Sequence, residues 1–312
     1  MNRKIIFDCD PGVDDAIALL LAFSAPKNLS ILGVTTLAGN VDAALTARNA
    51  CLIRDIAGCH NIPIFAGCKN PLLREAVKAS HFHGVSGLGN LPIFEPHGTI
   101  EIESAVDFIV RILSQAKPKE ITLVITGPMT NIATAIQRDP NIIQGLYEIV
   151  VMGGACSEGG NITASAEYNI YADPHAAKIV FNTSCELIVF GLDATHQVRA
   201  TPKRIATLRK GGTRSALVAA DLLEFSSTLP GNGSKEIGAP LHDPCPIAWL
   251  LAPQLFELQE CYLEVETQST AILGHTAVDF RIRAHHPAHV RWAVRADGQG
   301  IFDLLTDLLT SA

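Results

Sequence analysis

The chain has 312 residues, of which 48% are hydrophobic and 18% are charged, and its formal net charge at pH 7 is −7. This composition is typical of a globular protein and excludes a disordered chain. No run of lysine or arginine is present, which argues against a nucleic-acid partner and favours a small-molecule ligand. No apolar run is long enough to span a membrane and the N-terminus has no signal-peptide core, so we expect a cytoplasmic protein without membrane contact. The eight cysteines lack Cys-x-x-Cys spacing and are expected to be reduced.

Short apolar runs alternate with helical patterns along the chain. Strands are predicted near residues 4–8, 30–37, 62–66, 121–126, 149–153 and 186–191, and helices near 14–24, 42–57, 101–115, 130–137 and 174–182. Beyond residue 196 the pattern predicts helices at 201–210, 214–227 and 244–252, strands at 261–267, 275–283 and 290–296, and a last helix at 299–310. Continuous Val, Ile and Leu runs between helices indicate a parallel sheet covered on both faces. We therefore predict one α/β domain, residues 1–312, with an open, mostly parallel, doubly wound sheet and extra C-terminal helices and strands.

Four aspartates, Asp8, Asp10, Asp14 and Asp15, lie within eight residues near the N-terminus. The apolar run before them predicts a buried strand that leads through a tight turn into a helix. Each aspartate alone could cap the start of that helix. Together, converging carboxylates raise each other's pKa unless a cation lies among them, and all-oxygen ligands suit Ca²⁺ or Mg²⁺. The segment therefore predicts a metal-anchored active site.

Polar or glycine-rich residues follow five of the predicted strands. In open parallel sheets, ligands bind beyond the carboxyl ends of the strands. The segments are Asp8–Asp10, Gly39–Asn40, Thr126–Pro128, Met152–Gly154 and Asp193–His196. Any one of them could simply end a strand and start a helix, but five at one edge predict a binding site.

Two further groups of polar residues lie outside the strand ends. Glu167 and Asn169 stand at alternate positions, so both side chains point the same way if that segment is extended, and they suit sugar hydroxyls. His242 stands beside Asp243 at the predicted start of a helix. Asp243 could be a simple helix cap, whereas His242 could exchange a proton near neutral pH.

Several motifs, taken in order, resemble the inosine-uridine preferring nucleoside hydrolases over nearly the whole chain. They are Asp8-x-Asp-Pro-Gly-x-Asp-Asp-Ala16, Gly39-Asn40, His83-Gly-x-x-Gly-Leu88, Thr126-Gly-Pro128, Met152-Gly-Gly154, Ala166-Glu-Tyr-Asn169 and His242-Asp-Pro244. The resemblance implies the nucleoside hydrolase fold and a Ca²⁺-dependent enzyme that splits ribonucleosides into ribose and free base in nucleoside salvage. It also implies a homo-oligomer, either a tetramer or a dimer.

The resemblance also implies a role for individual residues. Ca²⁺ would be held by Asp10, Asp15, the main-chain carbonyl of Thr126 and Asp243, with Asp10 as the general base for the attacking water. The ribose hydroxyls would be held by Asp14, Asn40, Asn161, Glu167, Asn169 and Asp243, and Met152 would pack against the sugar. His242 would protonate the leaving base and His83 would contact it. A deoxyribose, or a 5′-phosphate facing Glu167, would then be poorly accommodated.

The region over the base departs from the family pattern. Gly89-Asn90 stands where the family usually has Asp-Gly, and residues 225–241 contain no Tyr or Trp, although relatives often place a tyrosine there. Phe225 could stack on the base instead, without a phenolic proton. With His242 retained, we expect pyrimidine-leaning or broad ribonucleoside use.

Two other classes of protein share part of this pattern. A Mg²⁺-dependent haloacid-dehalogenase-like phosphatase also opens with a strand and Asp-x-Asp, but it has Thr or Val where this chain has Gly12. A non-catalytic nucleoside-binding protein could use the same fold, although the intact Asp10 and His242 argue against it. A dinucleotide enzyme is disfavoured because no Gly-x-Gly-x-x-Gly follows the first strand. The cluster of His285, His286 and His289 is interpreted as a surface turn.

Overall fold

A twisted sheet of nine strands runs through the centre of the part of the chain that the computed structural model describes, namely residues 2–77, 83–229, 236–281 and 287–311. The order of strands across the sheet is β10 (Thr276–Asp279), β9 (Phe256–Val265), β11 (Val290–Ala296), β6 (Glu186–Phe190), β5 (Leu146–Met152), β4 (Ile121–Ile125), β1 (Arg3–Cys9), β2 (Leu29–Thr36) and β3 (Ile64–Ala66). In this order, each strand from β11 to β3 is parallel to the next one. Strand β9 pairs antiparallel with β10 on one side and with β11 on the other.

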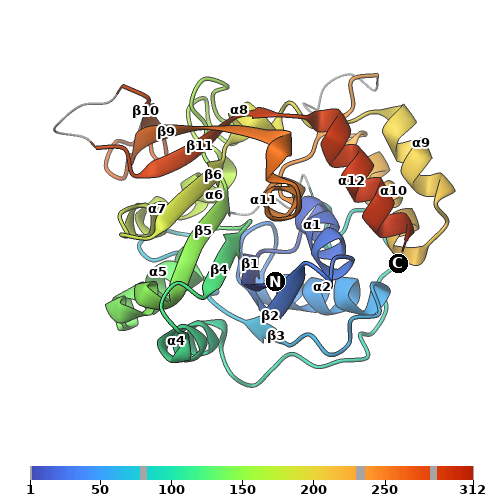
Figure 1. Ribbon diagram of the computed structural model, residues 1–312, viewed down its shortest axis with the longest axis horizontal. Helices are drawn as coiled ribbons and strands as arrows, with labels where there is room; N and C mark the ends of the chain where they lie inside the picture. The colour runs from blue at the N-terminus through green and yellow to red at the C-terminus, as the bar shows by residue number, and fades with distance from the viewer. Residues whose placement is uncertain (1, 78–82, 230–235, 282–286, 312) are drawn as a thin grey trace.

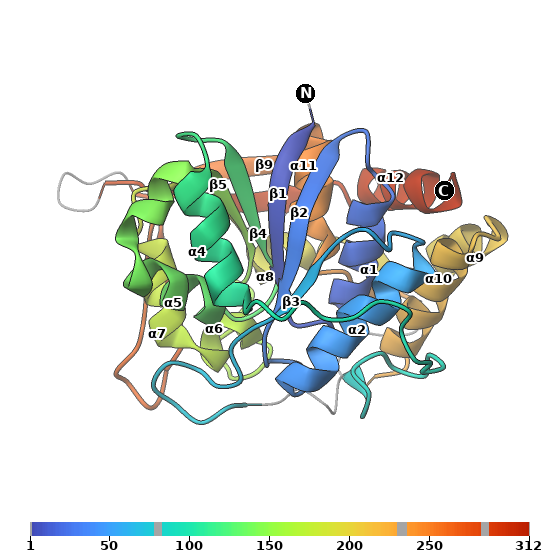
Figure 2. The same cartoon turned by 90° about the horizontal axis from the view of Figure 1, so that it is seen from below.

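Helices cover both faces of this sheet (Figures 1 and 2). One face carries α1 (Val13–Phe23), α2 (Ala43–Ile56), α10 (Arg214–Ser226), α11 (Pro244–Leu251) and α12 (Gly298–Thr310), and α9 (Pro202–Lys210) packs beside α10 and α12. The other face carries α4 (Ala105–Gln115), α5 (Thr130–Arg138) and α7 (Pro174–Phe181). Each layer has its own apolar core against the sheet, which confirms the predicted doubly wound α/β fold.

The central strands are mostly apolar because helices bury both sides of them. All five residues of β4 and the last five of β1 are buried, including Asp8 near the carboxyl end of β1. From β1 the chain winds outward to β2 and β3, and then returns through β4 to build the other half of the sheet. The strand order therefore reverses between β1 and β4, and the crevice at such a reversal is where ligands bind in open α/β sheets.

Two predicted boundaries were wrong, each for a local reason. The helix predicted at 101–115 begins only at Ala105, because the Ser104 hydroxyl caps it by accepting the amide of Asp107 at 3.2 Å. The strand predicted at 261–267 already begins at Phe256, because its first half pairs with β11. The described part of the strand predicted at 275–283 ends at Asp279.

Several short elements had no periodic signal in the sequence. They are the helices α6 (Tyr168–Ala172) and α8 (Leu192–Thr195), the 3-10 helices at Pro140–Gly145 and Pro253–Leu255, and the strand pair β7 (Arg199–Ala200) and β8 (Ala239–Pro240). Most of the loop at residues 229–235, and His285 and His286 of the histidine cluster, lie outside the described residues. Within the described residues, no helix combines the length and the apolar character that a membrane crossing requires.

Candidate active site

A cavity of about 340 Å³ opens at the carboxyl ends of the central strands. It lies beyond the carboxyl ends of the neighbouring strands β1 and β4, at the edge of the sheet where the sequence predicted a binding site. Ten of its lining residues were singled out from the sequence: Asp14, Asn40, His83, Thr126, Met152, Asn161, Glu167, Asn169, His242 and Asp243. Asp10 and Asp15 are fully buried and contact this set through Asn40 and Thr126. The fold therefore brings every predicted site residue to one place.

Asp10 is held by one carboxylate oxygen only. Its Oδ2 accepts the amide of Asn40 at 2.7 Å, while its buried Oδ1 has no hydrogen-bond partner. Glycines flank both oxygens: a Cβ at Gly39 would stand 2.0 Å from Oδ2, and a Cβ at Gly127 would stand 2.5 Å from Oδ1. Burial, and next the charge of Asp15, raise the pKa of Asp10 well above its usual range. Asp10 is thus a confined carboxylate with one oxygen left for another group.

Asp15 is more fully hydrogen-bonded than Asp10. Its Oδ2 accepts the amide of Gly12 and the side-chain amide of Asn40, both at 3.0 Å, and its Oδ1 accepts the Thr126 hydroxyl at 2.7 Å. The Gly12 contact means that Asp15 helps to satisfy the start of α1, so the cap interpretation and the site interpretation both apply to it. Burial raises the pKa of Asp15, and these hydrogen bonds oppose that rise.

Asp14 at the start of α1 and Asp243 at the start of α11 both line the cavity. Asp14 accepts the amide of His242 at 3.3 Å, and burial raises its pKa to about 7. Asp243 occupies the position before α11, but its side chain makes no capping hydrogen bond. Its pKa is raised well above the usual range, first by burial and then by the charges of Asp15, Asp14 and Asp10. The simple-cap interpretation of Asp243 is therefore wrong, and its carboxylate faces the other acids.

Glu167 and Asn169 reach the cavity from the start of a helix. The condition of an extended segment is met only as far as Glu167, which caps α6 by accepting the amides of Asn169 (2.9 Å) and Ile170 (3.2 Å). Its carboxylate also accepts the amide of Gly154 at 2.9 Å, and burial raises its pKa to about 7. The Asn169 side chain donates to the carbonyl of Thr126 at 2.7 Å. One helical turn thus joins this part of the wall to the end of β4.

Imidazoles gather on the other side of the cavity. The Nδ1 atom of His83 accepts the amide of Val13 at 3.0 Å, so a neutral His83 carries its hydrogen on Nε2. The Nδ1 atom of His242 lies 2.8 Å from the Thr195 hydroxyl. Burial, then the charges of His196 and Arg199, lower the pKa of His242 to about 3, so its ring is neutral at pH 7.

Sequence reasoning missed several residues that line the cavity. Among them are Tyr168, His196, Arg199, Ser226 and Pro240. The position of His196 after β6 was a usable signal, since that segment had been noted as a strand end. Arg199 reaches the cavity because β7 pairs with β8 in register with Pro240, and no local pattern indicates that pairing. The ring of Phe225 contacts Gly89 and lines a separate surface hollow.

The oxygen atoms on the acidic side of the cavity are of the kind that binds a hard cation. They are carboxylate oxygens and a main-chain carbonyl, and the unpartnered Oδ1 of Asp10 is a buried acceptor that a cation would satisfy. In the part of the chain that the structure describes, no three His, Cys, Asp or Glu side chains already stand at the spacing that holds an ion. The residues therefore fit a metal by the chemistry of their donor atoms.

Comparisons with known proteins agree with this fold and cavity. A family model described as inosine-uridine preferring nucleoside hydrolase matches residues 5–303. The chain is 38% identical to the inosine-uridine preferring nucleoside hydrolase of Crithidia fasciculata, over 99% of this chain and 98% of that protein. It is 41% identical to the pyrimidine-specific ribonucleoside hydrolase RihA of Photobacterium profundum, over the whole of both chains. A solved purine-preferring ribonucleoside hydrolase from Gardnerella vaginalis superposes with a TM-score of 0.91 at 30% identity, over 99% of this chain and 98% of that one.

The chain belongs to the inosine-uridine preferring nucleoside hydrolase family. It is accordingly an enzyme, an N-glycosidase that hydrolyses ribonucleosides. This confirms the predicted family and enzyme class, and it excludes the phosphatase and the non-catalytic binding protein.

Proposed function

We propose that the enzyme is a Ca²⁺-dependent ribonucleoside hydrolase with pyrimidine-leaning or broad base specificity. The observation that carries the proposal is the buried Asp10, with one oxygen anchored by Asn40 and the other without a partner beside four further acids. The pyrimidine-specific relative supports the pyrimidine lean, and the inosine-uridine preferring relative supports the broader range. Ribose and a free base would be the products, as nucleoside salvage requires.

Asp10, Asp15, the Thr126 carbonyl and Asp243 are the residues that would hold the Ca²⁺. When bound, the ion would position the attacking water, lower its pKa and offset the mutual repulsion of the acids. The other observations that support this donor set are the raised pKa values of all three carboxyls, each caused first by burial. Carboxylates buried this close together are stable in their charged form only with a compensating cation.

Asp10 is proposed as the general base because its Oδ1 has no hydrogen-bond partner within the protein, while Oδ2 stays anchored on Asn40. An oxygen with two lone pairs can face the cation with one and accept the water proton with the other. The water oxygen forms the new bond to C1′ of the ribose, and its proton passes to Asp10. The C1′–N bond breaks, with its electron pair leaving on the base nitrogen. The positive charge that develops on the sugar lies near the buried carboxylates, which stabilise it.

The ribose is proposed to lie against the acids and amides of the cavity wall, which are Asp14, Asn40, Asn161, Glu167, Asn169 and Asp243, with Met152 beneath the sugar. A site that hydrogen-bonds a hydroxyl rejects the analogue without it, because its buried polar groups are then left unpaired. Ribose release from uridine is therefore expected to exceed sugar release from 2′-deoxyuridine by at least about 10²-fold. Similar kcat/KM values for the two nucleosides, in a reducing-sugar assay with added Ca²⁺, would contradict this placement of the sugar.

His83 and His242 are proposed to form hydrogen bonds to the departing base. A neutral His83 presents Nε2–H as a hydrogen-bond donor, since its Nδ1 already accepts the Val13 amide. Because the lowered pKa leaves His242 neutral at pH 7, we assign it a hydrogen bond to the base in place of a stored proton. That bond is available when the Thr195 hydroxyl donates to Nδ1 and Nε2 carries the hydrogen.

Gly39 is expected to be essential for the position of Asp10. A methyl group there would stand 2.0 Å from the anchored Oδ2, so Gly39→Ala must displace the carboxylate or its Asn40 contact. We expect kcat for uridine to fall about 10²-fold, as for a catalytic group moved by about 1 Å. The matched control is Gly58→Ala, where the backbone is left-handed (φ 69°) and no atom lies within 4 Å. It should lower the melting temperature and leave kcat unchanged; a comparable loss of kcat in both variants would contradict the steric argument.

A cytoplasmic location and a homo-oligomer, tetramer or dimer, complete the proposal. Light scattering during size-exclusion chromatography tests the second: a mass near two or four times 33.3 kDa supports it, and a mass near 33.3 kDa refutes it.

A further inference from the structure

Arg199 is a charged residue of the cavity wall that the proposed mechanism does not use. It lies on β7, opposite Pro240 of β8, and the Leu241 amide donates to the Val198 carbonyl at 2.8 Å. These main-chain contacts place Arg199 beside the segment that carries His242. The guanidinium is partly buried and lines the same cavity. Its charge is one of the causes that keep His242 neutral.

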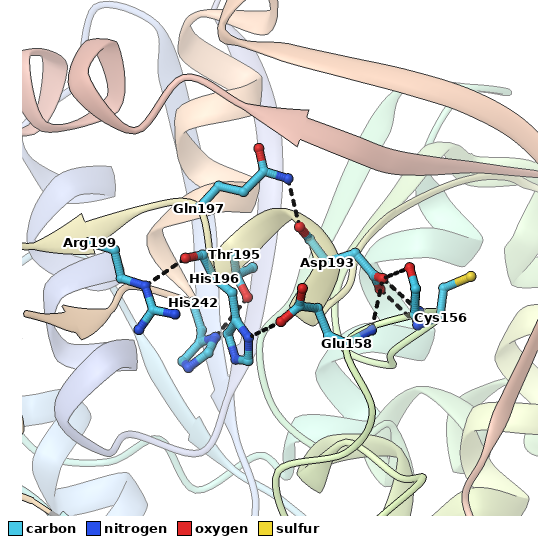
Figure 3. Close-up of polar contacts among 9 residues, drawn as sticks. Cys156, Glu158, Asp193, Thr195, His196, Gln197, Arg199 and His242 are labelled. Carbon is cyan, nitrogen blue, oxygen red and sulfur yellow. Dashed lines mark hydrogen bonds and ion pairs between the residues drawn. The ribbon is translucent and has the colours of Figure 1, made fainter. Parts of the chain in front are cut away.

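The Arg199 side chain is anchored at one end and unengaged at the other. Its Nε donates to the carbonyl of His196 at 2.6 Å. Among the described residues, no hydrogen bond or ion pair engages its two terminal nitrogens. Figure 3 shows the guanidinium on the same side of the segment as the rings of His196 and His242. The guanidinium is therefore oriented by the main chain, and its terminal N–H groups remain available to a ligand.

The segment that holds Arg199 is itself fixed by side-chain hydrogen bonds (Figure 3). The Nδ1 atom of His196 pairs with a carboxylate oxygen of Glu158 at 2.8 Å. Asp193 at the start of α8 accepts the amides of Cys156 and Ser157, each at 2.7 Å. The loop that carries Glu158 is thereby tied to α8. His196, the residue directly after α8, supplies the carbonyl that orients Arg199. A side chain that its neighbours hold in one orientation in this way is typical of a group that recognises one edge of a ligand.

We propose that Arg199 is a specificity-determining residue that selects nucleosides with a carbonyl on the base edge remote from the sugar. This inference rests on the proposed function. A guanidinium offers only donors, so it pairs with the carbonyl at C4 of uracil or C6 of hypoxanthine. Cytosine and adenine carry an amino group at that position, so a hydrogen-bond donor of the base would face the donors of the guanidinium.

The same contact strengthens as the glycosidic bond breaks. The C1′–N electron pair passes to the base nitrogen and is shared with the ring carbonyls of an oxo base. The water oxygen bonds to C1′, Asp10 takes the water proton, and the base anion takes a proton from solvent after release. Because the negative charge on the carbonyl grows along this path, the guanidinium stabilises the transition state more than the bound substrate.

The test compares kcat/KM for pairs of nucleosides that differ only at this position: uridine with cytidine, and inosine with adenosine. Arg199→Leu is expected to lower the uridine to cytidine ratio about 10- to 100-fold, the range for one charged hydrogen bond. Arg199→Lys, which keeps the charge, should retain more of the ratio. Arg209→Leu is the matched control, since Arg209 pairs on the surface with Asp221 and Glu224. A uridine to cytidine ratio within threefold of wild type in Arg199→Leu, or an equal change in Arg209→Leu, would overturn the proposal.

A second measurement needs no variant and no turnover. Calorimetric titration of the wild-type enzyme with free uracil and free cytosine should give tighter binding of uracil by about tenfold or more. Equal affinities would overturn the role of Arg199. If the wild-type enzyme released no ribose from any nucleoside yet still preferred uracil, the proposed function would fail and the assignment of Arg199 would stand.

Discussion

Replacing Asp10 with asparagine is expected to lower kcat for uridine by about 10³-fold or more, a loss within the range for removal of a general base. Asparagine has nearly the shape of aspartate and can still accept the Asn40 amide through its side-chain oxygen. Its amide nitrogen, however, can neither take the water proton nor bind a cation. The change therefore removes the chemistry at Oδ1 and retains the packing. Initial rates of ribose release at saturating Ca²⁺ measure it.

Asp8→Asn is the matched control for that experiment. Asp8 stands two residues earlier on β1, is equally buried, and accepts the Thr35 hydroxyl (2.5 Å) and the Asn131 side-chain amide (2.8 Å). Burial raises the pKa of Asp8 to about 7, so asparagine is close to the protonated form already present near neutral pH. We expect its kcat to stay within about tenfold of wild type, since Asp8 does not line the cavity. If Asp10→Asn kept wild-type turnover, Asp10 would not be the base.

Removal of metal is the second change with a large expected effect. Chelation should abolish ribose release, and Ca²⁺ should restore it. Because the ion binds only the folded chain, Ca²⁺ at 100 times its Kd should stabilise the fold by about 2.7 kcal/mol, visible as a higher melting temperature. Full activity and an unchanged melting temperature after exhaustive dialysis against a chelator would contradict the proposed metal site.

The metal effect should depend on pH with a definite sign. The folded-state pKa values of Asp14 and Glu167 are raised to about 7, so these groups stabilise the metal-free fold at low pH and lose that contribution as pH rises through 7. His242 acts oppositely: its lowered pKa destabilises the fold below its unfolded value of 6.5 and has no effect above it. From pH 6.5 to 8 the metal-free protein should therefore become less stable.

Ca²⁺ should offset that loss, because it would bind Asp10, Asp15 and Asp243 in their deprotonated form and release their protons, and its charge would favour the deprotonated form of the neighbouring Asp14 and Glu167. The increase in melting temperature on adding Ca²⁺ is thus expected to be larger at pH 8 than at pH 6. Scanning calorimetry at both pH values, with and without Ca²⁺, measures it. An increase that is equal at the two pH values would show that Ca²⁺ binding does not release protons from the buried acids.

Much of the fold was predictable because each central strand is buried on both faces. Runs such as Ile121–Ile125 are apolar except for one threonine, and helices separate them, so the alternation alone indicated a doubly wound sheet. The boundary errors arose where tertiary pairing extended an element, as at Phe256, or where a cap delayed it, as at Ser104. Short elements such as α6 and β7 are stabilised by contacts with distant segments, and no local periodicity reports such contacts.

The acidic half of the site was predictable for a different reason. Asp10, Asn40 and Thr126 each follow a strand, and parallel strands end at one edge of the sheet. The base side is built by segments whose meeting depends on the tertiary fold. Arg199 reaches it through the pairing of β7 with β8, so neither its presence nor its proposed partner on the base could be read from the sequence. Specificity for the base is therefore the part of the function that sequence patterns described least.

Ribose release from uridine, measured before and after chelation with Ca²⁺ then returned, tests the central claim most directly. We expect release that disappears with the chelator, returns with Ca²⁺ and is slower by about 10³-fold or more in Asp10→Asn. Ribose release that is indifferent to chelation, or that keeps its wild-type rate in Asp10→Asn, would contradict a metal-anchored site in which Asp10 is the general base.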